Sequence, residues 1–283
     1  MPSTPASKSS APWRRPSLTA IRSIGQASRH RLSANPRFCS ICQLVDASDL
    51  DEDFQRRIKG FKAGSGTFRM NVALSELPKF TCLPHNEKDG PGEHHQSGII
   101  LAPTLDYMDR AFLDAKQYGW SKKPIVEMLI PSTVDDSLAP PGQHVASLFC
   151  QQFAPELPAK EDGTLRDWDD EEDAAADTII DTVEAHAPGF RASILGRQVL
   201  SPKGLYRKFG LVGGDIMHGH MSLDQLWSAR PVLGHGAYRG PVNGLYMCGA
   251  GTHPGGGVTG APGHNAAQAI LADRPLLRKL LRS

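Results

Sequence analysis

Residues 244–271, GLYMCGAGTHPGGGVTGAPGHNAAQAIL, constrain the fold of this chain more than any other segment. A short apolar strand is predicted over 245–248, with Cys248 buried at its end. A glycine-rich turn follows, and a helix of small residues is predicted to begin near 259–262. Glycine has no Cβ and tolerates positive φ, so the backbone of such a turn can approach a ligand closely.

The helix that follows this turn directs free N–H groups and the positive end of its dipole toward the same place. The pattern therefore indicates a binding turn for a ligand that carries partial negative charge. The alternative is a tight connection between strand and helix whose glycines have only a structural role. Gly255, Gly257 and Gly260 also fit the dinucleotide pattern G-x-G-x-x-G, but only 23 residues follow Gly260. That length is too short for a helix, a second strand and a ribose-binding acid, so a pyrophosphate site at a first βα turn is excluded.

The same segment resembles the C-terminal flavin motif of the phytoene desaturase and amine oxidase group of FAD-dependent oxidoreductases. Within that group it most resembles the pyridine nucleotide-disulphide oxidoreductase domain-containing protein 2 subfamily and its bacterial relatives. The resemblance covers about residues 44–275 and includes SGTFRMNVALSELP (65–78), PIVEMLIPSTVDDSLAPPGQHVASLFCQ (124–151), APGFRASILGRQVLSP (187–202) and FGLVGGDIMHGHMSLDQLWSARP (209–231). It implies a two-domain flavoprotein in which the last strand and helix close the FAD-binding domain.

The resemblance also implies which residues contact the flavin. Residues 249–251 are expected to line the ribityl and phosphate region, and residues 256–258 are expected to bring backbone N–H groups to the pyrimidine edge. A helix N-terminus there would stabilise the negative charge that reduction places on the ring. The predicted cofactor-binding residues are Gly249, Ala250, Gly251, Thr252, Gly256, Gly257, Val258 and Thr259.

Two histidines are candidate catalytic residues. His218 lies in a second glycine-rich segment, residues 213–220, which the resemblance places over the flavin; we expect it to be a substrate-facing polar group. His253 lies within the turn itself, where it would contact flavin or act as a general acid or base, or else hold the turn in place. His218 and His220 form an H-x-H pair, but a metal site needs a third and usually a fourth ligand. We therefore predict no metal.

The chain divides into four predicted regions. Residues 1–43 contain seven basic residues and no acidic ones among many Ser and Pro, which indicates a disordered or foreign leader, with a mitochondrial presequence as the alternative. Residues 44–210 are the predicted substrate domain, 211–275 the C-terminal part of a FAD-binding domain, and 276–283 a tail. Members of the family begin with a G-x-G-x-x-G βαβ unit, and none precedes residue 44. The chain is therefore expected to be the C-terminal half of the family's chain.

Hydrophobic periodicity predicts a mixed α/β (α+β) fold with an antiparallel sheet and helices in the substrate domain. Phe68, Met70, Val72 and Leu74 alternate as in a half-buried strand. The predicted elements are strands over 67–74, 124–130 and 145–153 and helices over 51–58, 169–187 and the stretch between Thr104, an N-cap, and Gly119, a C′ residue.

Composition excludes several classes of protein. The 283 residues carry 31 basic and 30 acidic side chains, so nucleic acid is not an expected partner. No apolar run approaches the roughly 18 residues of a membrane span. Five cysteines are too few and odd in number for a disulfide framework. We therefore expect a protein of a reducing compartment, the cytoplasm or alternatively the mitochondrial matrix.

Two functions follow from these observations. The first is a FAD-dependent oxidoreductase, truncated relative to the family, that abstracts a hydride equivalent from an apolar small-molecule substrate. The second is a catalytically silent interaction or regulatory module that retains the substrate domain and associates with itself, as a homo-oligomer, or with a full-length relative. The absence of the nucleotide-binding half, which would leave apolar surface uncovered, motivates the second.

Overall fold

A computed structural model describes residues 45–64, 66–84 and 90–273 of the chain. All of them belong to the larger of two compact units, Pro36–Ser283. The predicted leader over 1–43 and the predicted tail over 276–283 lie outside the described residues. The predicted division at residue 210 stays a prediction.

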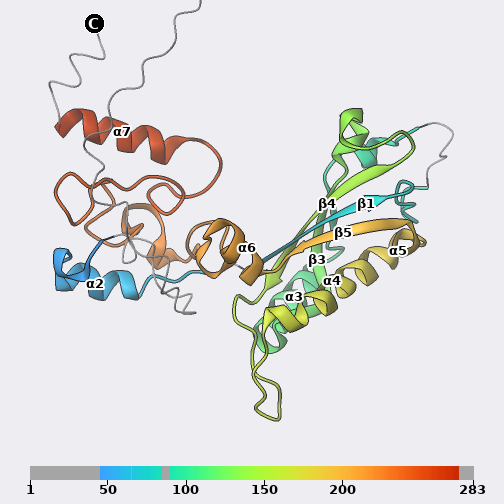
Figure 1. Cartoon of the computed structure of the whole chain (residues 1–283), viewed down its shortest axis with the longest axis horizontal. Helices are drawn as coiled ribbons and strands as arrows, with labels where there is room; N and C mark the ends of the chain where they lie inside the picture. Colours follow the sequence, from blue (N-terminus) through green and yellow to red (C-terminus); the bar gives the residue numbers. More distant parts are fainter. Residues whose placement is uncertain (1–44, 65, 85–89, 274–283) are drawn as a thin grey trace, which may run out of the picture. The chain divides into compact units, whose positions relative to one another are not determined.

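The core is built on a five-stranded antiparallel sheet, which confirms the mixed α/β fold (Figure 1). Its strand order is β2-β3-β4-β1-β5, and the strands are β1 (Thr67–Leu74), β2 (Ile99–Leu101), β3 (Trp120–Leu129), β4 (His144–Phe153) and β5 (Ile194–Leu200). In β1 the four alternating apolar residues from Phe68 to Leu74 are all buried. Strand alternation sends them to one face, where Phe68 lies opposite Cys150 and Met70 opposite Leu148 of β4.

Two long helices, α3 (Leu105–Tyr118) and α4 (Trp168–Glu184), both contact β3. The hydroxyl of Thr104 accepts a hydrogen bond from the N–H of Tyr107 at 3.1 Å, and Gly119 ends α3 with φ 99°. Both predicted caps are therefore confirmed. The apolar side of α4 joins the sheet in one core through Ala175, Ala176, Ile179, Ile180 and Val183.

Two strands and two α-helices of the sheet region were not predicted: β2, β5, α5 (Phe190–Ser193) and α6 (Pro202–Phe209). β5 is an edge strand with no fully buried residue, so it lacks the alternation that marks β1. The predicted strand 124–130 begins earlier, at Trp120, and the predicted helix 169–187 ends at Glu184. Among the described residues the shorter elements are α2 (Glu52–Lys59), α5 (Phe190–Ser193), η1 (Ala47–Asp49), η3 (Glu93–Gln96), η4 (Pro131–Thr133) and η5 (Asp136–Leu138).

The segment after α6 consists mostly of turns. It contains η6 (Val212–Gly214), η7 (Leu223–Gln225) and η8 (Trp227–Ala229), and it ends with α7 (Ala261–Asp273), the predicted small-residue helix. The predicted strand over 245–248 is wrong, because only an isolated bridge between Tyr246 and Arg239 forms there. A strand needs a neighbouring strand to satisfy its backbone N–H and C=O groups. All five strands of the described residues pair within the sheet β2-β3-β4-β1-β5, so residues 245–248 have no such neighbour.

A second apolar cluster supports this segment. Leu50, Phe54 and Ile58, from α2 and the residue before its N-cap, are buried together with Val232. Among the described residues, no helix has the length and apolar character needed to cross a membrane.

Candidate functional site

The predicted cofactor-binding residues form a turn, residues 249–260, whose first half is closed by its own hydrogen bonds. The N–H and the hydroxyl of Thr252 donate to the carbonyl of Gly249 at 3.0 and 2.9 Å. The N–H of Gly255 then donates to the carbonyl of Thr252 at 2.7 Å. Gly249 and Gly255 have φ of 92° and 102°, a region that glycine enters without steric cost. This half of the turn is therefore internally braced.

The second half of the turn is open. Gly257 and Val258 are exposed, and Val258 has the positive φ of 55° that β-branched residues rarely adopt. Within the described part of the chain, the N–H groups of Gly256, Gly257 and Val258 form no hydrogen bond. Thr259 accepts from the N–H of Ala261 at 3.2 Å, where α7 begins. Such N–H groups beside a helix N-terminus fit a ligand that carries negative charge.

The second glycine-rich segment packs against this turn. A Cβ at Gly251 would lie 3.7 Å from the carbonyl oxygen of His218, and one at Gly256 would lie 3.1 Å from Sδ of Met217. A side chain at residue 251 would therefore make an ordinary contact, whereas the small size of Gly256 leaves room for Met217. His218 itself is exposed and has φ 54°. The structure thus brings His218 together with the turn, and its catalytic role stays a prediction.

His253 contributes to the turn through its backbone. Its carbonyl accepts a hydrogen bond from the hydroxyl of Tyr238 at 2.9 Å, and that hydroxyl accepts from the amide of Asn265 on α7 at 2.8 Å. The ring nitrogen Nδ1 of His253 is buried and has no hydrogen-bond partner among the described residues. Because buried polar atoms are normally satisfied, this nitrogen is a candidate contact for a bound ligand. Its predicted role in proton transfer is not tested by the geometry.

Sequence reasoning missed Arg230, the largest fully buried side chain of the described residues. Its Nε donates to the carbonyl of Ala250 at 2.8 Å, and its terminal nitrogens donate to the carbonyls of Met217, Gly219 and Gln225. Burial lowers the pKa of Arg230, and the negative charge of Asp215 opposes that shift. In the sequence, the importance of Arg230 was indicated only by its position within residues 209–231, one of the segments that carry the family resemblance.

Asp215 is the second buried charged residue at this site. Its carboxylate accepts hydrogen bonds from the N–H groups of Gly64 and Met217, both at 2.8 Å. It therefore ties the chain just before β1 to the second glycine-rich segment. Like Arg230, Asp215 was not predicted to be a site residue. A single Asp in a glycine-rich stretch is equally typical of an ordinary turn.

Cys248 is exposed, so the expectation that it is buried in a strand is wrong, for the same reason that no strand forms there. The described residues contain no group of three or more His, Cys, Asp or Glu arranged to hold a metal ion.

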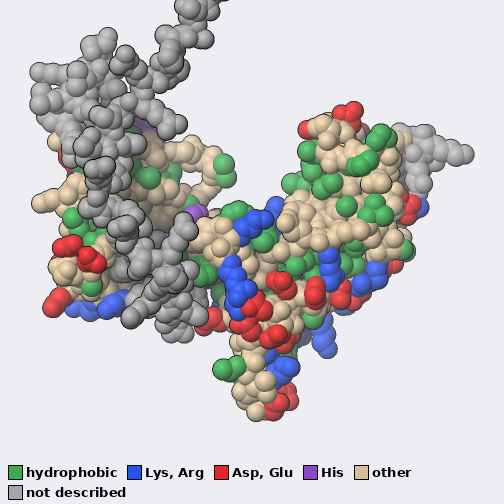
Figure 2. Space-filling model, viewed as in Figure 1, with side chains coloured by type: hydrophobic (Ala, Val, Ile, Leu, Met, Phe, Trp, Pro, Cys, Tyr) green, Lys and Arg blue, Asp and Glu red, His purple; other side chains and the backbone are tan. Residues whose placement is uncertain are grey.

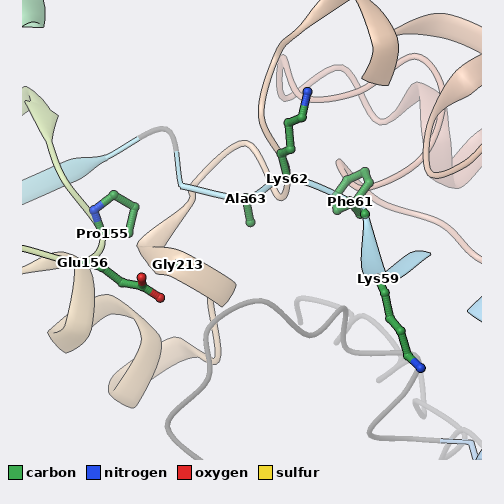
Figure 3. A pocket seen from close by; sticks show the side chains of 8 residues that line it. Lys59, Phe61, Lys62, Ala63, Pro155, Glu156 and Gly213 are labelled. Atoms are coloured by element: carbon green, nitrogen blue, oxygen red, sulfur yellow. The ribbon is translucent and has the colours of Figure 1, made fainter. Parts of the chain in front are cut away.

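A cavity of about 420 Å³ has no residue of the predicted turn in its lining. It is lined by residues 59–63 together with Pro155, Glu156 and Gly213. Figure 3 shows the side chains of Lys59 and Lys62 pointing in opposite directions, with the carboxylate of Glu156 near neither ammonium group. The charged side chains do not converge on one point, so this cavity does not replace the turn as the candidate site.

Comparisons with known proteins identify relatives of the chain. No family model matches it. The chain is 45% identical over 249 residues to pyridine nucleotide-disulfide oxidoreductase domain-containing protein 2 of Rattus norvegicus, which covers 87% of this chain and 42% of the rat protein. The mouse protein of the same name shows the same identity and coverage. The chain is also 31% identical over 148 residues to the lycopene-forming phytoene desaturase of Pseudescherichia vulneris, covering 50% of this chain and 27% of that enzyme.

The chain thus spans about two fifths of the length of the curated relatives that it matches over most of its residues. Because the match covers 87% of the chain, it must include the sheet and α4. Over most of its length the chain is thus a relative of pyridine nucleotide-disulfide oxidoreductase domain-containing protein 2, and over about half of its length it is more distantly similar to a phytoene desaturase.

Proposed function

We propose that the chain is part of a FAD-dependent oxidoreductase that removes a hydride equivalent from an apolar substrate, and that the turn 249–260 holds the flavin. The observation that carries this proposal is the set of N–H groups at Gly256, Gly257 and Val258, immediately before α7, which have no hydrogen-bond partner among the described residues. Bound FAD would supply the chemistry of two-electron acceptance. The residues of the chain would donate hydrogen bonds to the flavin and stabilise negative charge on it through the dipole of α7.

The surroundings of the turn support an apolar substrate. Met217 packs against Gly256 and is itself exposed, as is Met221 nearby in the sequence. Methionine adapts its shape to apolar ligands because its side chain is unbranched and polarizable. We assign His218, exposed beside these residues, to orienting the substrate, and the buried Nδ1 of His253 to holding or moving a proton.

Gly257→Val tests the flavin assignment. Gly257 has φ 136°, which a β-branched residue adopts only at a cost of about 1–3 kcal/mol, so valine should distort the open half of the turn. We expect the affinity for FAD to fall at least about tenfold, measured by fluorescence titration on protein whose circular dichroism matches that of the wild type.

Two controls accompany this variant. Cys248→Ser changes an exposed residue next to the turn, and Gly163→Val imposes a similar backbone strain at φ 82° in a loop elsewhere. Both should bind FAD as the wild type does. Equal affinity in the wild type and in folded Gly257→Val would overturn the assignment of this turn to the flavin.

A second function, a catalytically silent interaction module, is favoured by exposed apolar side chains. Large apolar residues are exposed both on α3 and between residues 221 and 258, and such surface commonly marks a protein interface. They are Leu105, Met108, Phe112, Leu113, Met221, Leu223, Trp227, Leu233 and Val258. An interaction module should form oligomers at micromolar concentration whether or not flavin is added, which light scattering after size exclusion would detect.

A further inference from the structure

Arg230 combines a full charge with complete burial. Its exposed fraction is 0%, and its guanidinium lies 5.8 Å from the ring centre of Phe61. Removing an ionised group from water costs several kcal/mol unless its surroundings replace the lost hydration. The contacts of Arg230 must therefore supply that replacement.

Backbone carbonyl groups replace most of the hydration that the Arg230 guanidinium loses on burial. Nε donates to Ala250 at 2.8 Å, Nη1 to Gln225 at 3.3 Å, and both terminal nitrogens reach Gly219. Nη2 also donates to Met217. These acceptors come from three separate stretches of chain, which the planar guanidinium joins in one arrangement. A lysine could not do the same, because its compact ammonium has three donors and no rigid fork.

The guanidinium also lies directly against the proposed flavin turn. A Cβ at Gly255 would be 3.7 Å from Nε of Arg230, so this glycine lies in contact with the arginine side chain. The first half of the turn is closed by hydrogen bonds of Thr252, which donates to Gly249 and accepts from Gly255. Ala250 lies near the start of this half and Gly255 lies at its end. Arg230 therefore contacts both ends of the closed half, and it links them to Met217 and Gly219 of the second glycine-rich segment.

We propose that Arg230 is a positioning residue that holds the turn 249–256 against residues 217–219, in the conformation in which the turn receives flavin. This inference rests on the proposed function for its link to flavin, but the bracing of the turn can be measured without any cofactor. Arg230 touches neither substrate nor reacting atoms in this role. It acts through the carbonyls of Ala250, Met217 and Gly219.

Hydrogen exchange on the full chain without flavin is the first test. In Arg230→Gln, peptides that contain residues 217–219 and 249–255 should exchange at least about tenfold faster than in the wild type, and peptides of β1 and β4 should not change. Arg230→Lys keeps the charge but loses the fork, so it should show a smaller increase in the same peptides. If Arg230→Gln does not fold, Arg230→Lys still reports on the turn. The control is Arg56→Gln, which changes a side chain that is 77% exposed.

FAD titration of the same proteins is the second test. We expect Arg230→Gln to bind FAD at least about tenfold more weakly, Arg230→Lys to recover part of that loss, and Arg56→Gln to match the wild type. Unchanged exchange at 249–255 in both Arg230 variants would overturn the inference, as would acceleration spread evenly over the sheet. Local acceleration with undiminished FAD affinity would overturn the link to flavin. If the wild type binds no FAD while the local acceleration is observed, the proposed function fails and the bracing by Arg230 stands.

Discussion

At the scale of single residues, burial separates the chemistry of the free cysteines. Cys150 lies in β4 with its side chain fully buried in the sheet core, and burial raises the pKa of its thiol well above the usual range. Cys82 and Cys248 are exposed. Since the thiolate is the reactive form, Cys150 should react far more slowly than Cys82 and Cys248, although the sequence gives no sign of this difference.

We therefore expect native protein treated with iodoacetamide near pH 8 to be alkylated at Cys82 and Cys248 at least about a hundredfold faster than at Cys150, as followed by mass spectrometry of peptides. In denaturant the three should react at similar rates, which is the control for intrinsic reactivity. Rapid alkylation of Cys150 in folded protein would contradict its place in the core.

At the scale of elements, ion pairs connect the start of α4 to α6. Lys203 and Arg207 of α6 both bond to the carboxylate of Asp169, and basic and acidic side chains lie next to one another in this region (Figure 2). The hydrogen bonds from Arg207 and then Lys203 lower the pKa of Asp169 to about 2, from an ordinary value of 3.8. A carboxyl whose pKa is lower in the folded state stabilises the fold above its unfolded pKa and loses that contribution as the pH falls toward 2.

Asp169→Asn should therefore reduce the free energy of unfolding at pH 7 by at most about 1 kcal/mol, because the pair is largely exposed. The difference from wild type should vanish between pH 4 and pH 2, measured by urea unfolding across that range. Asp170→Asn removes a charge from the same first turn, so it controls for the effect on the helix dipole. A difference that persists undiminished at pH 2 would show that Asp169 acts through something other than its charge.

At the scale of the whole molecule, the proposed site predicts a link between FAD and stability. A ligand that binds only the folded state raises stability by RT ln(1 + [L]/Kd), about 2.7 kcal/mol at a hundred times Kd. For a chain of this size that corresponds to an increase in Tm of roughly 5–10 °C, which differential scanning calorimetry would measure. The increase should grow with FAD concentration in the wild type and be much smaller in Gly257→Val. A Tm independent of FAD up to millimolar concentration would contradict flavin binding by this chain.

The strands and helices that sequence patterns predicted well are those that carry a full pattern within their own residues. β1 and β4 were predicted to within one residue, because β1 alternates fully and β4 is rich in apolar residues that alternate in burial over part of its length. β2 and β5 were missed, since edge strands present few buried positions. The strand over 245–248 was predicted from apolar residues alone, and it does not form because the described residues offer it no neighbouring ladder.

The sequence by itself determined the glycine turn, the helix that follows it and the alternating core strands. Each of these depends on properties local to a few residues: the φ freedom of glycine, the spacing of apolar side chains and the residues that cap a helix. Only the tertiary structure decided that Arg230 and Asp215 are buried beside the turn. The physical reason is that a buried charge needs hydrogen-bond partners, which here come from distant parts of the chain. These partners are backbone C=O and N–H groups, which nearly every residue has, so the sequence does not indicate which of them will meet the charge.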